Sequence, residues 1–125
     1  MDLEKTGREI VLAAVRVHSA LGPGLLESAY QVCLSHELND AGLDVVCEMT
    51  LPVVYRGLTL DAGYKIDMVI NGSVIIENKA VERLLPVHEA QLLTYLKLKK
   101  CKLGFLLNWN VPVMKEGIKR MVLNL

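Results

Sequence analysis

The chain has 125 residues, 52% of them hydrophobic and 22% charged, a composition that excludes a disordered protein and fits one folded domain over residues 1–125. Its 14 basic and 14 acidic residues cancel, so the chain has no general excess of positive charge with which to coat a nucleic acid. No apolar run approaches the roughly 18 residues that cross a bilayer, and residues 1–4 lack the order of a signal peptide, so we expect a cytoplasmic protein without a membrane partner.

The N-terminal third predicts two helices. Thr6 and Glu9 have the spacing of a capping box, and apolar residues at helical intervals continue behind them to about Ala20. The Gly-Pro-Gly segment 22–24 ends this helix. A second helix is expected over about 25–40, because large apolar side chains recur along one stripe before an Ala-Gly end.

The remainder alternates strands with one helix. Residues 45–55 are rich in β-branched side chains, although Pro52 argues for a break or an edge position. Two further strands, joined at Asn71-Gly72, have the strongest short-range hairpin signal. Pro86 suits the first turn of a third helix, and a buried strand follows it. The tail over 117–123 fits either a strand or a helix. The expected order is α-α-β-β-β-α-β, with the later elements over 60–70, 73–80, 86–99 and 103–109.

Three charged residues stand in the otherwise apolar hairpin: Asp67, Glu77 and Lys79. Desolvating an isolated charge costs several kcal/mol, so charged groups rarely occupy such strands unless they are paired or bind a metal. Two carboxylates converging on one strand pair make a hard oxygen site suited to Mg²⁺ or Mn²⁺. The alternative is an acid–lysine ladder of salt bridges on a solvated face.

The turn decides whether the two carboxylates meet, because side chains alternate along a strand. A two-residue loop, Asn71-Gly72, would put Asp67 on the face opposite to Glu77. A three-residue loop over 70–72, with Gly72 left-handed in a bulge, would pair Val69 with Ser73 and put both carboxylates on one face. It would also gather an apolar face of Ile66, Met68, Ile70, Val74 and Ile76, so we predict the three-residue loop.

Several segments together resemble a known family. The run Gly24-Leu25-Leu26-Glu27-Ser28-Ala29-Tyr30 matches the signature of the GxxExxY protein family, a branch of the PD-(D/E)XK nuclease superfamily. The likeness spans about 17–122 and continues through Asp67, Glu77-Asn78-Lys79-Ala80, the segment 88–96 and the segment 103–108.

The resemblance implies a restriction-endonuclease-like α/β core, a mixed sheet of four or five strands flanked by helices. It implies a Mg²⁺-dependent nuclease of DNA, or of RNA, in which Asp67, Glu77 and the helical acid Glu27 hold the metal. Lys79 is then the catalytic lysine, and Gln91 and Tyr95 resemble the Gln-x-x-x-Tyr pair that lies beside the site in RecB-like members. Two positions depart from the pattern: Lys65 where relatives usually have arginine, and Asn78 where an apolar residue is usual. Asn78 would face the core and needs a hydrogen-bond partner.

Plainer interpretations stay open at this point. Glu27 also suits the first turn of a helix, and Gln91 with Tyr95 also fits a structural pair on a helix face. We interpret His88 as a first-turn polar residue, His18 as packing and Trp109 as core; the lysines near 97–102 fit a helix end or a nucleic-acid contact. Two rival functions remain, a catalytically silent binding module and a homo-oligomer, the latter prompted by the high apolar content.

The three cysteines, Cys33, Cys47 and Cys101, are widely spaced and form no CxxC pair. This disfavours a zinc or iron–sulfur site and predicts reduced, mostly buried thiols.

Overall fold

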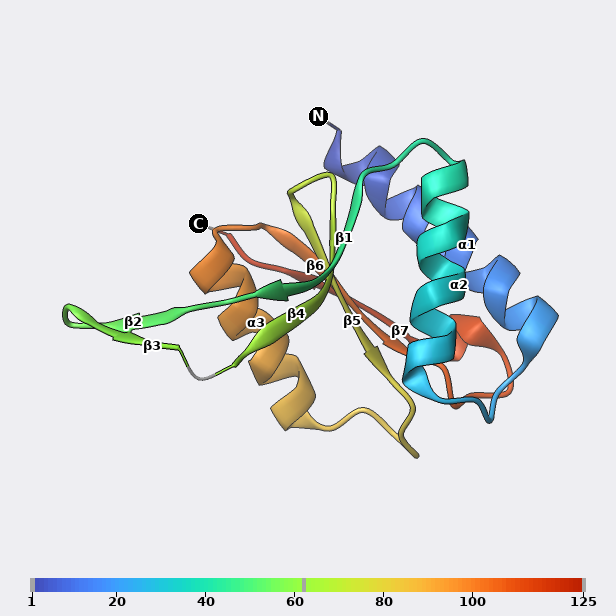
Figure 1. Ribbon diagram of the computed structural model, residues 1–125. Helices are drawn as coiled ribbons and strands as arrows, with labels where there is room; N and C mark the ends of the chain where they lie inside the picture. Colours follow the sequence, from blue (N-terminus) through green and yellow to red (C-terminus); the bar gives the residue numbers. More distant parts are fainter. Residues whose placement is uncertain (1, 62, 125) are drawn as a thin grey trace.

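The computed structural model describes residues 2–61 and 63–124 as a mixed sheet with helices on both faces (Figure 1). The five-stranded sheet has the order β1-β4-β5-β6-β7, in which only β5 and β6 run parallel. The expected mixed sheet flanked by helices is confirmed. Its elements are α1 (Leu3–Leu21), α2 (Glu27–Asp40), β1 (Val45–Thr50), β4 (Lys65–Ile70), β5 (Val74–Lys79), α3 (Pro86–Lys99), β6 (Leu103–Asn108), the 3₁₀ turn η1 (Met114–Gly117) and β7 (Ile118–Val122).

Two hydrophobic clusters hold the layers together, one on each face of the sheet. On one face α1 and α2 pack through side chains such as Ile10, Tyr30 and Leu34 against β4, β5 and β6. On the other face α3 packs through Leu92, Tyr95 and Leu96. The parallel pair β5 and β6 is joined through α3, as a crossover connection requires. The sheet is therefore covered on both sides, and the end of β5 lies between the two helical layers.

A separate hairpin projects from the body of the molecule (Figure 1). It consists of β2 (Val53–Tyr55) and β3 (Leu58–Leu60), which form a two-stranded sheet of their own. We call residues 53–60 the arm. The strands expected over 45–55 and 60–70 are thus each divided, and the first division falls at Leu51-Pro52 because proline cannot donate to a ladder.

Three boundaries differ from the expectations. The capping box of Thr6 and Glu9 is wrong, because Asp2 caps α1 instead, accepting hydrogen bonds from Glu4 N and Lys5 N at 3.1 and 3.2 Å. Thr6 therefore lies inside the helix and donates to Asp2 O. The second helix begins at Glu27 rather than near residue 25. The undecided tail is the strand β7, preceded by η1.

All three cysteines are free, as predicted, but they differ in exposure. Cys101 is buried and Cys33 half-buried, whereas Cys47 is exposed on the edge strand β1, so the expectation of mostly buried thiols is wrong for Cys47. Across the described ranges, no helix combines the length and the apolar character needed to span a membrane.

Candidate active site

The turn between β4 and β5 brings the two carboxylates onto one face. Ile70 pairs with Val74, which leaves the three residues 71–73 in the loop. Asn71 and Gly72 both have a left-handed backbone, with φ of 52° and 67°. The predicted loop length is right, although the loop lies one residue further along than 70–72. The register of the pairing moves by an even number of positions, so the predicted shared face of the carboxylates is retained.

The candidate site lies where β4 and β5 stop pairing. The last ladder pair is Met68 with Ile76, and beyond it the two strands run apart (Figure 1). There the two carboxylates accept the backbone hydrogen bonds that carbonyl groups accept in a regular ladder. Asp67 N donates to Glu77 Oε2 at 2.8 Å, and Asn78 N donates to Asp67 Oδ2 at 2.8 Å. Each carboxylate is thus fixed by a backbone N–H of the opposite strand.

The other edge of β4 is also distorted at this point. Cys47 pairs with Met68 and Met49 with Ile66, but the intervening Glu48 has a left-handed backbone with φ of 55° and no ladder partner. Because of this distortion, the expectation that Ile66 and Met68 lie on one apolar face is wrong. Ile66 packs in the cluster beneath α3, whereas Met68 packs beneath α1 and α2, so the two do not share an apolar face.

The site favours the neutral form of its acids. Glu77 is only 3% exposed, and burial, followed by the charge of Asp67, raises its pKa from 4.5 to about 8. Burial likewise raises the pKa of Asp67; the Asn78 N–H lowers it, and the charges of Glu48 and Glu27 raise it again. Two neighbouring carboxylates in a desolvated place therefore lack sufficient positive charge to stabilise both as anions.

Lys79, Gln91 and Tyr95 form a chain of hydrogen bonds beside these acids. Lys79 Nζ donates to Gln91 Oε1, and Gln91 Nε2 donates to Tyr95 Oη, both at 3.3 Å. Burial and then the charges of Glu77 and Asp67 raise the pKa of Tyr95, which places its ring close to both acids. Among the described residues, no ion pair joins Lys79 to a carboxylate, so the ladder of salt bridges is not what occupies this face.

Glu27 joins the site from α2. It is the first residue of that helix, and its Oε1 accepts a hydrogen bond from Ala80 N at 3.1 Å. Both interpretations of Glu27 are therefore compatible with its place: it is a first-turn acid and it lies at the end of β5, where its charge reaches Asp67.

Asn78 points to the opposite face, as expected for the residue between Glu77 and Lys79. It is 1% exposed, and its Oδ1 accepts from Trp109 Nε1 at 2.9 Å. Its amide nitrogen donates to Gln31 Oε1 at 3.2 Å. The predicted need for partners is confirmed, and the polar side chain is anchored beneath the two residues that flank it.

The side chains of Trp109, His18 and His88 have structural places. Trp109 is buried and stacks on Tyr30 with 4.7 Å between ring centroids. His18 packs on the same indole, and its Nε2 lies 2.9 Å from Val111 O. His88 Nδ1 accepts from Leu85 N in the first turn of α3.

Sequence reasoning missed Glu48. Its charge raises the pKa of both Asp67 and Glu77, so it belongs to the electrostatic surroundings of the site. The available signal was an acidic residue in the middle of the strand-forming run 45–50, the same kind of signal that identified the hairpin acids.

The donor set at the end of β5 suits a divalent cation. The buried Glu77 and the half-buried Asp67 offer carboxylate oxygens whose like charges need a cation, and the Lys79 amine is bonded elsewhere. The carboxylates of Glu27, Asp67 and Glu77 do not all lie within 4.8 Å of one another.

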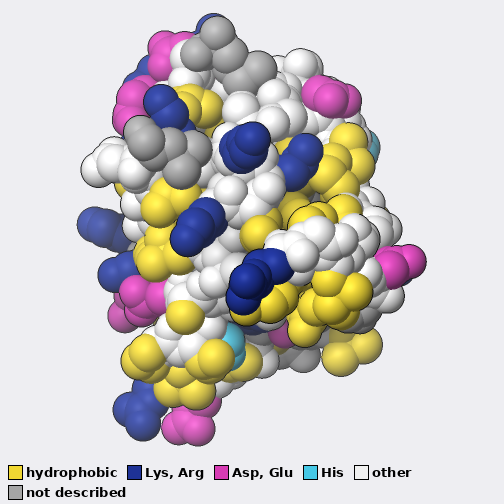
Figure 2. All heavy atoms as spheres, turned by 90° about the vertical axis from the view of Figure 1, so that its left-hand side faces the viewer, with side chains coloured by type: hydrophobic (Ala, Val, Ile, Leu, Met, Phe, Trp, Pro, Cys, Tyr) yellow, Lys and Arg dark blue, Asp and Glu magenta, His cyan; other side chains and the backbone are white. Residues whose placement is uncertain are grey.

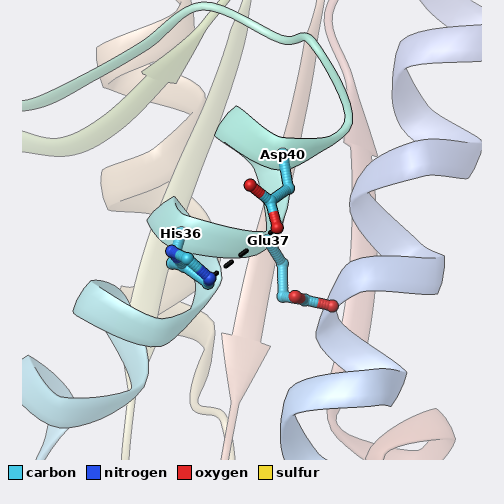
Figure 3. A group of neighbouring side chains, drawn as sticks. All are labelled: His36, Glu37 and Asp40. Carbon is cyan, nitrogen blue, oxygen red and sulfur yellow. Dashed lines mark ion pairs between the residues drawn. The ribbon is translucent and has the colours of Figure 1, made fainter.

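One group of three ligand-type side chains in the described residues does meet that spacing, and it lies elsewhere (Figure 3). His36, Glu37 and Asp40 stand near the C-terminal end of α2, at the other end of the helix from Glu27. Glu37 is already paired with Arg16 at 2.8 Å, and His36 lies 3.7 Å from Asp40. This exposed group is a set of surface ion pairs and is separate from the site on the sheet.

Comparison with known proteins identifies one family. The family model described as the PD-(D/E)XK nuclease superfamily matches residues 4–121. No curated protein and no solved structure gave a match. The matched range runs from the first turn of α1 into β7, and the α/β order agrees with the restriction-endonuclease-like fold of that superfamily.

Proposed function

The chain belongs to the PD-(D/E)XK nuclease superfamily, and on this premise we propose that it is a divalent-metal-dependent nuclease acting on phosphodiester bonds. The observation that carries the proposal is the pair of the half-buried Asp67 and the buried Glu77, held together where β4 and β5 separate, with the Lys79 amine on the same face. A fold alone would not be enough, because one fold hosts many activities.

Each residue has a role that follows from its position. Asp67 and Glu77 would hold the cation, Mg²⁺ or Mn²⁺, with Glu27 as an additional acid. When bound, such an ion polarises a phosphoryl oxygen and lowers the pKa of a coordinated water. Lys79 would orient the attacking water and offer positive charge to the phosphate. Gln91 holds the Lys79 amine, and Tyr95 holds Gln91, so this pair positions the lysine.

We further propose that the chain is a GxxExxY member and that its substrate is DNA, with RNA as the second choice. The segment 24–30 supports this assignment, since it ends in the buried Tyr30 and includes Glu27 beside β5.

Cleavage assays test the activity directly. Purified protein is incubated with linear, nicked and single-stranded DNA and with RNA, in Mg²⁺, Mn²⁺ or EDTA. We expect cleavage that requires a divalent ion and that falls at least about a hundredfold in Glu77→Ala and in Lys79→Ala, because each removes a group that contacts the reacting atoms. Glu116→Ala and Lys115→Ala are matched controls, because both side chains are exposed. The proposal of a nuclease would be refuted if no substrate were cleaved in a metal-dependent way. It would also be refuted if Glu77→Ala and Lys79→Ala both cleaved as fast as the wild type.

A catalytically silent binding module is the second candidate. The balanced charge of the chain favours it, and so does the spacing of Glu27, Asp67 and Glu77, whose carboxylates do not all lie within 4.8 Å of one another. Such a module would bind nucleic acid or protein without cleavage, and the Glu77→Ala variant would bind as well as the wild type. The mass in solution, measured by light scattering, tests the associated proposal that the chain forms a homo-oligomer.

A further inference from the structure

The exposed aromatic side chains of this protein are confined to one region. Tyr55 at the tip of the arm is 62% exposed, and Tyr64, which precedes β4, is 48% exposed. The chain's other aromatic residues are all buried, at 7% exposure or less: Tyr30, Tyr95, Phe105 and Trp109. Large rings left in water, one on the arm and one just before β4, indicate a surface that contacts a partner.

A basic residue directly follows each of these tyrosines. Arg56 follows Tyr55, and Lys65 follows Tyr64; both basic side chains are exposed. Figure 2 shows the side toward which the arm points: Lys and Arg side chains lie across the middle of this face among hydrophobic ones, while most Asp and Glu side chains lie toward its edges. Exposed rings and cations within one region of the surface are the features with which proteins bind single-stranded nucleic acid, since bases stack on the rings and phosphates meet the cations.

This region is continuous with the candidate active site. Tyr64 O accepts a hydrogen bond from Leu51 N at 2.8 Å, and Leu51 packs in the same cluster as Tyr95. Tyr64 also contributes to the raised pKa of Tyr95, as do the charges of Glu77 and Asp67. A strand of nucleic acid lying along the arm would therefore reach the carboxylates by way of Tyr64.

We propose that the arm and its connection to β4 bind a single-stranded segment of nucleic acid and lead it to the carboxylates. Bases stack on Tyr55 and Tyr64, and Arg56 and Lys65 contact the phosphates. A duplex fits this surface less well, because its bases are already stacked on one another and binding would depend on phosphate contacts alone. The inference rests on the proposed function, in that it takes the site at Asp67 and Glu77 to be a nuclease site.

Fluorescence anisotropy with labelled oligonucleotides tests the inference in EDTA, where no cleavage is expected. The probes are a single-stranded DNA, its RNA equivalent and a blunt duplex of the same sequence. We expect the wild type to bind a single strand more tightly than the duplex, and Tyr55→Ala and Tyr64→Ala each to weaken that binding roughly tenfold. Tyr64→Phe keeps the ring and should bind like the wild type. Val54→Ala is the matched control, because this side chain is 60% exposed on the arm but offers no ring.

The outcomes separate this inference from the proposed function. Equal binding of single strand and duplex, or unchanged binding in both alanine variants, overturns the inference even if the protein cleaves DNA. Ring-dependent binding of a single strand by a protein that cleaves nothing supports the inference and refutes the nuclease. If light scattering instead gives a dimer that dissociates in Tyr55→Ala, the arm is an interface between two copies, and the inference is wrong. Circular dichroism confirms that each variant is folded.

Discussion

Replacing Glu77 with glutamine should stabilise the metal-free protein at neutral pH. The native protein holds the Glu77 proton more tightly than the unfolded chain does, because burial and the neighbouring Asp67 raise the pKa from 4.5 to about 8. Between these two values the native state binds more protons than the unfolded state, so the free energy of unfolding falls as the pH rises. Glutamine has no proton to lose at this position, so the free energy of unfolding of Glu77→Gln should depend much less on pH between these two values.

The magnitude follows from the same shift. At about 1.4 kcal/mol for each pH unit, keeping Glu77 protonated at neutral pH lowers the free energy of unfolding by roughly 3 kcal/mol relative to acidic pH, because the unfolded chain releases this proton. The carboxamide keeps an acceptor for Asp67 N–H, but its new N–H₂ group needs a partner, which offsets about 1–2 kcal/mol. The net expectation is a gain of roughly 1–2 kcal/mol near neutral pH and a loss of roughly 1 kcal/mol near pH 4.5, where the titration gain is nearly absent but the unpartnered N–H₂ group remains.

Urea unfolding in EDTA, followed by circular dichroism at several pH values, measures this gain. Glu116→Gln is the control, since that side chain is exposed. Added Mg²⁺ should raise the stability of the wild type and leave Glu77→Gln nearly unchanged, because a ligand that binds only the native state stabilises it. The account of the carboxylate pair is wrong if Glu77→Gln is no more stable than the wild type in EDTA at neutral pH. It is also wrong if Mg²⁺ raises the free energy of unfolding of Glu77→Gln as much as that of the wild type.

Three further variants follow from the contacts. Asn78→Ala removes the acceptor of the buried indole N–H and should cost about 1–3 kcal/mol in urea unfolding, whereas exposed Asn110→Ala should cost little. Gln91→Ala frees the Lys79 amine and should lower the cleavage rate at least about tenfold without changing the melting temperature; an unchanged rate would remove Gln91 from the site. Gly117→Ala should destabilise by several kcal/mol, because its β carbon would collide with a backbone oxygen of β6; an unchanged melting temperature would contradict that close approach.

The face of the carboxylates was predictable because strand alternation is a local property. Once Asp67 and Glu77 were placed in one hairpin, only the number of loop residues remained to be decided. The Asn71-Gly72 turn restricted it to two or three, and this choice sets whether the two carboxylates share a face. The same alternation turned Asn78 to the other face and implied that it needs a partner. That partner, Trp109, comes from a strand end far along the chain, and no local pattern identifies it.

The backbone distortion at Glu48 and the arm were not predictable, for a different reason. The strand-forming signal runs through 45–55, and the left-handed backbone at Glu48 has no glycine or asparagine to mark it. Pro52 marked a break, but its result, a hairpin that leaves the sheet, depends on how the chain returns to β4. The first helix likewise began earlier than Thr6, because Asp2 offers a cap of comparable strength.

The hydrogen bond between Trp109 and Asn78 has an optical consequence. Trp109 is the chain's single tryptophan, and its indole N–H is bonded to the residue between Glu77 and Lys79. Any shift of that short stretch of β5 changes the polarity around the indole, so the intrinsic fluorescence of the protein is a built-in reporter of the site. Titration with an ion or an oligonucleotide can then be followed without a label. The reporter, Trp109, lies on the face of the sheet opposite to the carboxylates, so it does not contact the added ligand.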